Sequence, residues 1–199
     1  MCRILLVRHA DHPLAATTLV GRDDDNAVHL SERGQQQAAQ LAQLLADEPI
    51  DCLQSSPRLR CIETAEALAA EFDLPLMVEP ALDEIDFGAW TGIQFAQLEH
   101  DPKWYAWNMH RAQTRPPGGE TIAEARMRIL QHMESMSLRY PSRTIVMVTH
   151  AEIIRAVRLH RAGLGADAWR NVDVPLASIT TLDLASARFS EEILEAAAS

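Results

Sequence analysis

The chain has 199 residues, of which 47% are hydrophobic, and it carries a formal net charge of −10 at pH 7 with a pI near 5.2. This length and composition predict one domain, residues 1–199, that buries a sizeable core. The acidic balance argues against broad binding to nucleic acid or to an anionic membrane, while leaving room for a local cationic pocket that binds a small anion.

The predicted strands are short apolar runs of the kind that parallel sheets bury. They cover residues 2–7, 50–54, 75–79, 144–149 and 177–184, of which the first and fourth are the clearest. The first run ends in Arg8-His9 and the fourth ends in His150. Because the carboxyl ends of parallel strands meet at one edge of a sheet, these two histidines are expected to share a site.

Helical patterns separate the strands. Ser31 is placed to cap the first helix, and Pro57 suits the first turn of the second. A third helix is expected to begin near Thr121, after a turn, and a fourth to follow His150. Strands that alternate with helices imply right-handed crossovers and a layered α/β sandwich with helices on both faces.

The segment 83–120 has no convincing strand. Its large aromatic residues include Trp90, Trp104, Tyr105 and Trp107. We expect a helical insertion over the catalytic edge of the sheet, with aromatic rings packed beneath a long connection in preference to stacking on a substrate. The Ala/Glu-rich tail, residues 185–199, predicts a peripheral helix or a fraying end.

Cysteine usage and the lengths of the apolar runs bear on the compartment. The cysteines, Cys2, Cys52 and Cys61, form neither a CxxC pair nor an even-numbered disulfide framework, which favours a reducing environment. The apolar run at residues 4–7 is too short for a signal-peptide core, and no later run is long enough to span a bilayer. We therefore expect a soluble, cytoplasmic protein.

Four separated segments carry charged side chains in a specific order. They are LLVRHA at 5–10, SSPRLRCIETA at 55–65, LDEIDFGAWTG at 82–92 and VTHAE at 148–152. Together they resemble the histidine phosphatase superfamily, also called phosphoglycerate-mutase-like, and the resemblance extends from residue 3 to about residue 184. It implies a three-layer α/β/α sandwich around a mostly parallel sheet, which agrees with the elements predicted above.

The resemblance also implies roles for individual residues. His9 occupies the position of the histidine that accepts the phosphoryl group, and a neutral imidazole is a suitable nucleophile. Arg8, Arg60 and His150 would stabilise the charge on the transferring group, for which paired guanidinium hydrogen bonds are well suited. Glu84 would protonate the departing oxygen and then activate water.

Other positions are open to two interpretations. Arg60 is preferred to Arg58 because it stands four residues before the family's Thr-Ala pair, and Arg58, about 200° away around a helix, is expected to be exposed. Arg22 is a candidate for binding substrate or for simple solvation. Ala151 is a further candidate for binding phosphate. For Glu84 the alternative is a solvated acidic loop shared with its neighbouring aspartates.

Departures from the family pattern concern substrate choice. Ala10 replaces the commonest glycine, Asp11 stands where glutamate is frequent, and Ala151 follows His150 in place of glycine. None of these changes removes a charged catalytic group. We therefore expect them to alter the width of the pocket and how closely the backbone approaches the substrate, and to leave the type of reaction unchanged.

A phosphatase is favoured over a mutase because the chain is short and has DEIDFGAW in place of the mutases' Glu-Arg-His-Tyr-Gly. One alternative is hydrolysis by a divalent metal held by HADH at 9–12 and by Asp23–Asp25, although this set has no recognised ligand spacing. Another is a phosphate-binding module without turnover.

The favoured reaction needs no metal or cofactor. Its partner would be a small phosphorylated metabolite, with no nucleic acid or membrane, and the oligomeric state stays open.

Overall fold

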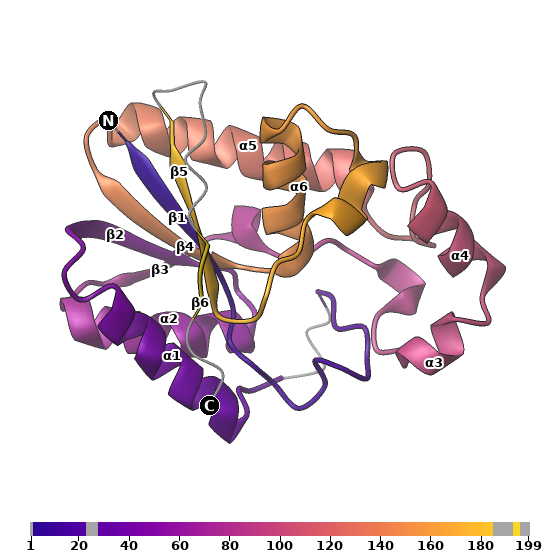
Figure 1. Cartoon of the computed structure of the whole chain (residues 1–199), viewed down its shortest axis with the longest axis horizontal. Helices are drawn as coiled ribbons and strands as arrows, with labels where there is room; N and C mark the ends of the chain where they lie inside the picture. Colours follow the sequence, from indigo (N-terminus) through magenta and orange to yellow (C-terminus); the bar gives the residue numbers. More distant parts are fainter. Residues whose placement is uncertain (1, 23–27, 185–192, 196–199) are drawn as a thin grey trace.

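The structure is a computed structural model, and it describes residues 2–22, 28–184 and 193–195 (Figure 1). Its centre is a six-stranded sheet in the order β3-β2-β4-β1-β5-β6. The strands are β1 (Arg3–Arg8), β2 (Ile50–Ser55), β3 (Leu76–Val78), β4 (Thr144–Thr149), β5 (Ser178–Asp183) and β6 (Ile193–Glu195). The strands β1 to β4 are parallel, and β5 and β6 add antiparallel pairs at one edge. The predicted mostly parallel sheet is confirmed.

One sequence prediction about the tail is wrong. Residues 193–195 form β6 and pair with β5, where a helix or a fraying end was expected. Ladder hydrogen bonds to the open edge of β5 outweigh the helical preference of the surrounding Ala/Glu composition. The rest of the tail, residues 185–192 and 196–199, lies outside the described residues.

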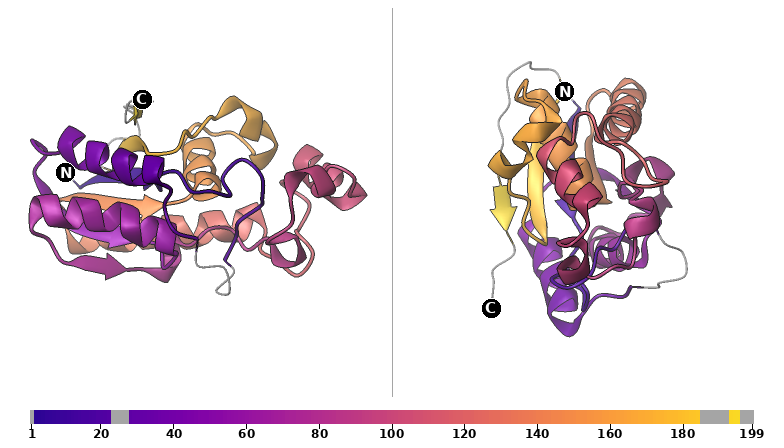
Figure 2. Two further views of the ribbon diagram at one scale, coloured as in Figure 1. Left: turned by 90° about the horizontal axis from the view of Figure 1, so that it is seen from below. Right: turned by 90° about the vertical axis from the view of Figure 1, so that its right-hand side faces the viewer.

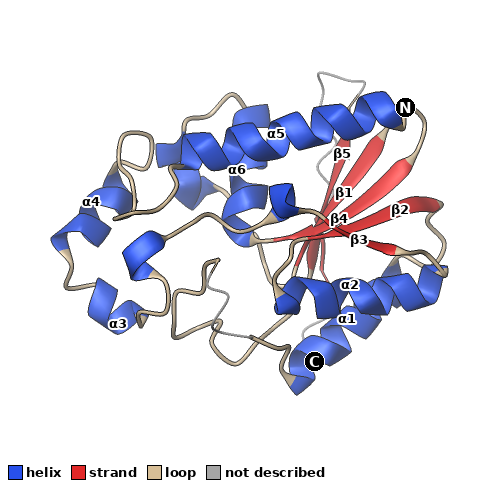
Figure 3. Cartoon of the chain, turned by 180° about the vertical axis from the view of Figure 1, so that it is seen from behind, coloured by secondary structure: helices blue, strands red, loops and turns tan. Residues whose placement is uncertain are grey.

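The central strands are apolar on both faces because helices cover both. Successive side chains of β1 point to opposite sides of the sheet. Leu5 and Val7 pack with α1 (Glu32–Leu44) and α2 (Leu59–Phe72), whereas Ile4 and Leu6 pack with α5 (Ile122–Arg139) and α6 (Ala151–Arg161). Figure 3 shows these two helix pairs on opposite sides of the sheet. The α/β/α sandwich is therefore present in the molecule.

The predicted helix starts are confirmed to within two residues. The Ser31 side chain caps α1 by accepting from the backbone N–H of Gly34, and Thr121 forms a reciprocal capping box with Glu124 at the start of α5. Helix α2 begins at Leu59, two residues after Pro57. These signals are local, which explains why sequence alone could find them.

Gly34 joins α1 to the loop that follows β1. A Cβ at position 34 would lie 2.0 Å from the backbone oxygen of Asp11, so only glycine lets the helix approach this closely. The same oxygen accepts from the backbone N–H of Ser31 at 3.0 Å. Helix α1 is thereby anchored to the residues directly after Arg8-His9.

The insertion is helical, as predicted. It contains α3 (Phe95–Leu98), α4 (Pro102–Met109) and the short 3₁₀ turn η2 (Gly88–Trp90). Figures 1 and 2 show α3 and α4 projecting beyond the end of the sheet at which β1 and β4 finish. The 3₁₀ turn η3 (Ala166–Asn171) adjoins it, and Trp169 there donates from Nε1 to the backbone oxygen of Asn108 at 3.0 Å.

The aromatic rings of the insertion are mostly buried. Trp90 and Trp107 are 2% and 1% exposed, and the ring centroids of Trp104 and Trp107 stack 5.3 Å apart. Tyr105 is the exception at 66% exposed. These tryptophans therefore pack under the connection as expected, and Trp104 and Trp107 also line a cavity. Among the helices that the structure describes, none combines the length and the apolar character needed to cross a bilayer.

Candidate active site

A cavity of about 320 Å³ is lined by residues from the carboxyl end of β1, from the insertion and from the start of α6. This volume is at the lower end of the range for small-molecule pockets. The predicted site residues on its wall are Arg8, His9, Arg60, Glu84 and Ala151. They come from the end of β1, the first turn of α2, the start of the insertion and the first residue of α6, so the fold brings together what the sequence separates.

The imidazole of His9 is buried and held as one tautomer. Its Nδ1 lies 2.9 Å from the backbone oxygen of Ala10, and a carbonyl oxygen only accepts, so Nδ1 carries the proton. Nε2 is left with a lone pair. Burial, followed by the positive charges of Arg60 and Arg8, lowers the pKa of His9 well below its usual value. The ring is therefore neutral and nucleophilic in mildly acidic and neutral solution.

Two guanidinium groups flank this imidazole. Arg60 is 3% exposed, and its Nη2 donates to the backbone oxygen of Gly21 at 3.4 Å and to Nδ1 of His150 at 3.1 Å. Arg8 donates from Nη1 to the backbone oxygen of Val174. Burial lowers the pKa of both arginines, but a guanidinium still keeps its charge. The result is a cationic pocket in an acidic protein, as the composition allowed.

His150, the remaining predicted residue of the charged site, is fully buried and is not on the cavity wall. Its ring centroid is 5.3 Å from that of His9. Because Nδ1 accepts from Arg60, the proton is on Nε2, which donates to Oγ of Ser56 at 2.7 Å. Ser56 in turn donates to Oδ1 of Asp83 at 3.4 Å. This chain fixes the ring and directs its unprotonated nitrogen towards Arg60.

Glu84 is a buried carboxyl group, so the alternative of a solvated acidic loop is wrong for it. Its side chain lines the cavity, and Oε1 accepts from the backbone N–H of Ile85 at 2.9 Å. Burial, followed by repulsion from Glu152, raises the pKa of Glu84 to about 7. Its neighbour Asp83 is also buried, and Asp86 accepts from the backbone N–H of Gly88.

Arg58 and Arg22 support the acidic loop from outside the cavity. The expectation that Arg58 is exposed is wrong, because its Nη2 pairs with Oδ2 of Asp83 at 3.0 Å and its side chain is 14% exposed. A buried carboxylate draws in this cation. Arg22 donates from Nε to the backbone oxygen of Glu84 at 2.7 Å and from Nη2 to Glu120 at 2.8 Å. Arg22 therefore holds the backbone of Glu84.

Several residues on the cavity wall were not predicted to belong to a phosphate site. They are His12, Arg111, Glu152, Arg155 and Trp169. The His12 ring lies 5.3 Å from the His9 ring, and burial lowers the pKa of His12 to about 4. The guanidinium of Arg111 lies between the rings of Trp107 and Trp169, at 4.0 and 3.8 Å from their centroids. Arg111, Arg155 and Trp169 lie outside the four motif segments, so only the fold could assign them.

The structure does not support the alternative of a metal site within the described residues. Within the ranges that the structure describes, no group of three or more His, Cys, Asp or Glu side chains is arranged to hold a metal ion. Asp23–Asp25, proposed above as ligands, lie outside the described residues. The three cysteines are free and buried.

The chain is similar in sequence and in structure to known phosphatases. The family model of the histidine phosphatase superfamily (branch 1) matches residues 4–195. Phosphoserine phosphatase 1 of Hydrogenobacter thermophilus is 33% identical over 174 residues, covering 84% of this chain and 78% of that protein. Bifunctional protein Rv2228c of Mycobacterium tuberculosis is 31% identical over 181 residues, covering 89% of this chain and 49% of that protein, so this chain spans about half its length. The structure of mycobacterial glucosyl-3-phosphoglycerate phosphatase superposes with a TM-score of 0.79 at 25% identity, covering 90% of this chain and 88% of that chain.

Proposed function

Because this chain belongs to branch 1 of the histidine phosphatase superfamily, we propose that it hydrolyses phosphomonoesters through a phosphohistidine on His9, without a metal ion. The observation that carries the proposal is the neutral His9 imidazole, with its Nε2 unprotonated, in a cavity that also contains Arg8, Arg60 and the Glu84 carboxyl group. Nucleophile, anion site and proton donor are then within one pocket.

In the first step, Nε2 of His9 attacks phosphorus and forms a P–N bond as the ester P–O bond breaks. The protonated Glu84 carboxyl group gives its proton to the departing oxygen, so an alcohol leaves and Glu84 becomes a carboxylate. In the second step, that carboxylate takes a proton from water, whose oxygen attacks phosphorus. The P–N bond breaks, inorganic phosphate leaves, and both His9 and Glu84 return to their starting states.

Fixed positive groups stabilise the charge on the transferring phosphoryl oxygens. Arg8 and Arg60 supply guanidinium donors, with Arg60 held in place by His150. The backbone N–H of Ala151 is in the first turn of α6, before the first intrahelical bond, which Ile154 donates to the His150 carbonyl. The N-terminus of this helix therefore adds to the anion site.

The relatives' names support a small phosphorylated metabolite as substrate, since one is called a phosphoserine phosphatase and another a glucosyl-3-phosphoglycerate phosphatase. The modest cavity volume of about 320 Å³ is consistent with a compact ligand. We also propose that residues 1–199 act as one catalytic domain. A cytoplasmic location is proposed as well, on the basis of the buried free cysteines.

The proposal is tested by measuring phosphate release from a panel of phosphomonoesters in the presence and absence of EDTA. We expect turnover of at least one compound, at the same rate with and without the chelator. Loss of activity in EDTA, restored by a divalent cation, would favour the metal hydrolase. Phosphate binding without turnover would favour a binding module, and phosphoryl transfer to a second metabolite without phosphate release would favour a mutase.

The raised pKa of Glu84 predicts the pH dependence of activity. The protonated carboxyl is the form that assists departure of the alcohol, so kcat/KM for an alkyl phosphate is expected to fall about tenfold per pH unit above about pH 7. The depressed pKa of His9 keeps the nucleophile unprotonated on the acid side. A pH–rate profile checks this expectation, and the alkaline limb should disappear in Glu84→Gln. A wild-type limb that persists in that variant would point to another group.

A further inference from the structure

The wall of the cavity contributed by α6 and the insertion carries a second group of charges, beyond those assigned to the phosphoryl site. Glu152 accepts from Nη1 of Arg111 at 2.7 Å through Oε2 and from Nη1 of Arg155 through Oε1. Attraction to these two arginines lowers the pKa of Glu152 despite its burial, so it is ionised. The three side chains together carry one net positive charge.

Arg111 is a fixed part of this group. It is 4% exposed, stacked between Trp107 and Trp169, and its Nη2 donates to Oδ1 of Asn108 at 3.0 Å. A guanidinium held in this way orients Glu152 and contributes charge, but it has little room to reach a ligand.

Arg155 differs from Arg111 because one of its terminal nitrogens has no hydrogen-bond partner among the described residues. Its Nε donates to the backbone oxygen of Val172 at 3.0 Å and its Nη1 to Glu152, while Nη2 makes no hydrogen bond to any residue that the structure describes. The side chain is 14% exposed and lines the same cavity as His9. Arg155 is therefore a residue of the cavity wall that keeps a donor nitrogen for a ligand.

The net charge of the cavity wall indicates what kind of ligand the cavity attracts. The charged residues on the cavity wall, among those described, are Arg8, Arg60, Arg111, Arg155, Glu84 and Glu152. With Glu84 protonated for catalysis, three positive charges are uncompensated. A phosphomonoester dianion neutralises two of them, which leaves one positive charge on the cavity wall uncompensated. Leaving a charge unpaired in such a site is unfavourable.

We propose that Arg155 binds a carboxylate on the leaving group, so that the preferred substrates are phosphorylated hydroxy or amino acids. This specificity site rests on the proposed hydrolase, because it requires the phosphoryl group to be at His9. The carboxylate would accept from Nη2 of Arg155, with Arg111 and Glu152 holding that guanidinium in place.

Matched ligands that differ in the carboxylate alone test the proposal. In the first pair, glycerol 3-phosphate replaces the carboxylate of 3-phosphoglycerate with a hydroxymethyl group. In the second, phosphoethanolamine replaces that of phosphoserine with hydrogen. Each compound is assayed as a competitive inhibitor of 4-nitrophenyl phosphate hydrolysis. For at least one pair, we expect the carboxylated member to have an inhibition constant about tenfold or more lower in the wild-type protein.

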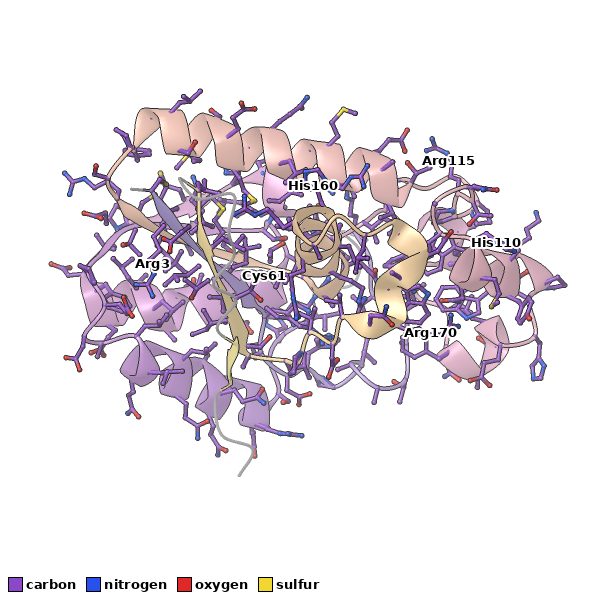
Figure 4. All side chains as sticks on the ribbon, turned by 45° about the horizontal axis from the view of Figure 1, so that its top comes forward. Arg3, Cys61, His110, Arg115, His160 and Arg170 are labelled. Carbon is purple, nitrogen blue, oxygen red and sulfur yellow. The ribbon has the colours of Figure 1, made fainter. Side chains whose placement is uncertain are left out.

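Arg155→Gln should abolish this preference. We expect it to raise the inhibition constant of the carboxylated compound about 10- to 100-fold and to change that of the compound without the carboxylate by less than about threefold. Arg155→Lys keeps the charge and should retain part of the preference. The matched control is Arg170→Gln, because Arg170 lies over the same Trp169 ring but is exposed and outside the cavity (Figure 4). It should behave as wild type.

Equal inhibition constants within both pairs in the wild-type protein would overturn the proposal, whether or not Arg155→Gln folds. So would a carboxylate preference that survives in folded Arg155→Gln. If no compound of the phosphomonoester panel is hydrolysed, the proposed function is what fails. In that case, or if 4-nitrophenyl phosphate alone is not hydrolysed, the same pairs can be compared by calorimetric binding to His9→Ala. A preference there supports the carboxylate site, and equal affinities oppose it.

Discussion

Replacing His9 with alanine is expected to reduce kcat for phosphomonoester hydrolysis by about 10⁴-fold or more, because the covalent route is lost with its nucleophile. The remaining activity would come from the cationic pocket alone, since Arg8 and Arg60 are untouched. The measurement is phosphate release under saturating substrate. In parallel, protein quenched in detergent without acid after brief mixing with ³²P-labelled substrate should carry label in wild type and none in His9→Ala.

The control for this experiment is His160→Ala, which removes an exposed imidazole near the end of α6, away from the cavity (Figure 4). This variant should retain the wild-type rate and label. A folded His9→Ala protein that turns over within tenfold of wild type would refute the nucleophilic role. Turnover in wild type together with unlabelled Glu84→Gln protein would argue against a long-lived phosphohistidine.

Replacing Glu84 with glutamine is expected to lower kcat/KM for an alkyl phosphate by about 10²- to 10⁴-fold. Glutamine keeps the size of the side chain and an oxygen for the Ile85 N–H, but it cannot donate the proton that an alkoxide needs. A nitrophenolate leaves without protonation, so the same variant should lose far less kcat/KM with 4-nitrophenyl phosphate. Water attack is slowed as well, and labelled protein should accumulate.

The dependence on leaving group is what separates proton transfer from simple positioning. Equal losses with both substrates would mean that Glu84 shapes the pocket and does not act as the acid. Asp86→Asn is the matched control, because Asp86 is in the same loop and binds the backbone of Gly88 away from the cavity wall. Its activity should stay within a few fold of wild type.

The fold was largely predictable because its signals are local or repeated. The buried runs of β1 and β4, the Ser31 cap and the Thr121 capping box are each written within a few residues. The antiparallel pairing of β5 and the existence of β6 were not, because strand direction and edge pairing depend on contacts between distant segments. A three-residue strand in an Ala/Glu-rich tail has no periodicity to detect.

The site was predictable where a motif marks it. His9, Arg8, Arg60 and Glu84 converge on the cavity as expected. The supporting residues were harder to find: Ser56 and Asp83 act on His150 through hydrogen bonds that join three separate segments. The helical angle of Arg58 correctly predicted that it would not line the same pocket as Arg60, but it could not show the carboxylate of Asp83 that buries Arg58.

The close contact between Gly34 and the backbone of Asp11 has a mechanical consequence. The loop after β1, which holds the His9 ring, packs against α1. This helix contributes no residue to the cavity wall. Any side chain at position 34 would push α1 and this loop apart and is expected to shift Ala10, whose backbone oxygen holds Nδ1 of His9. Under the proposed mechanism, the alignment of His9 for phosphoryl transfer thus depends, in part, on the absence of a single methyl group on the far side of the loop.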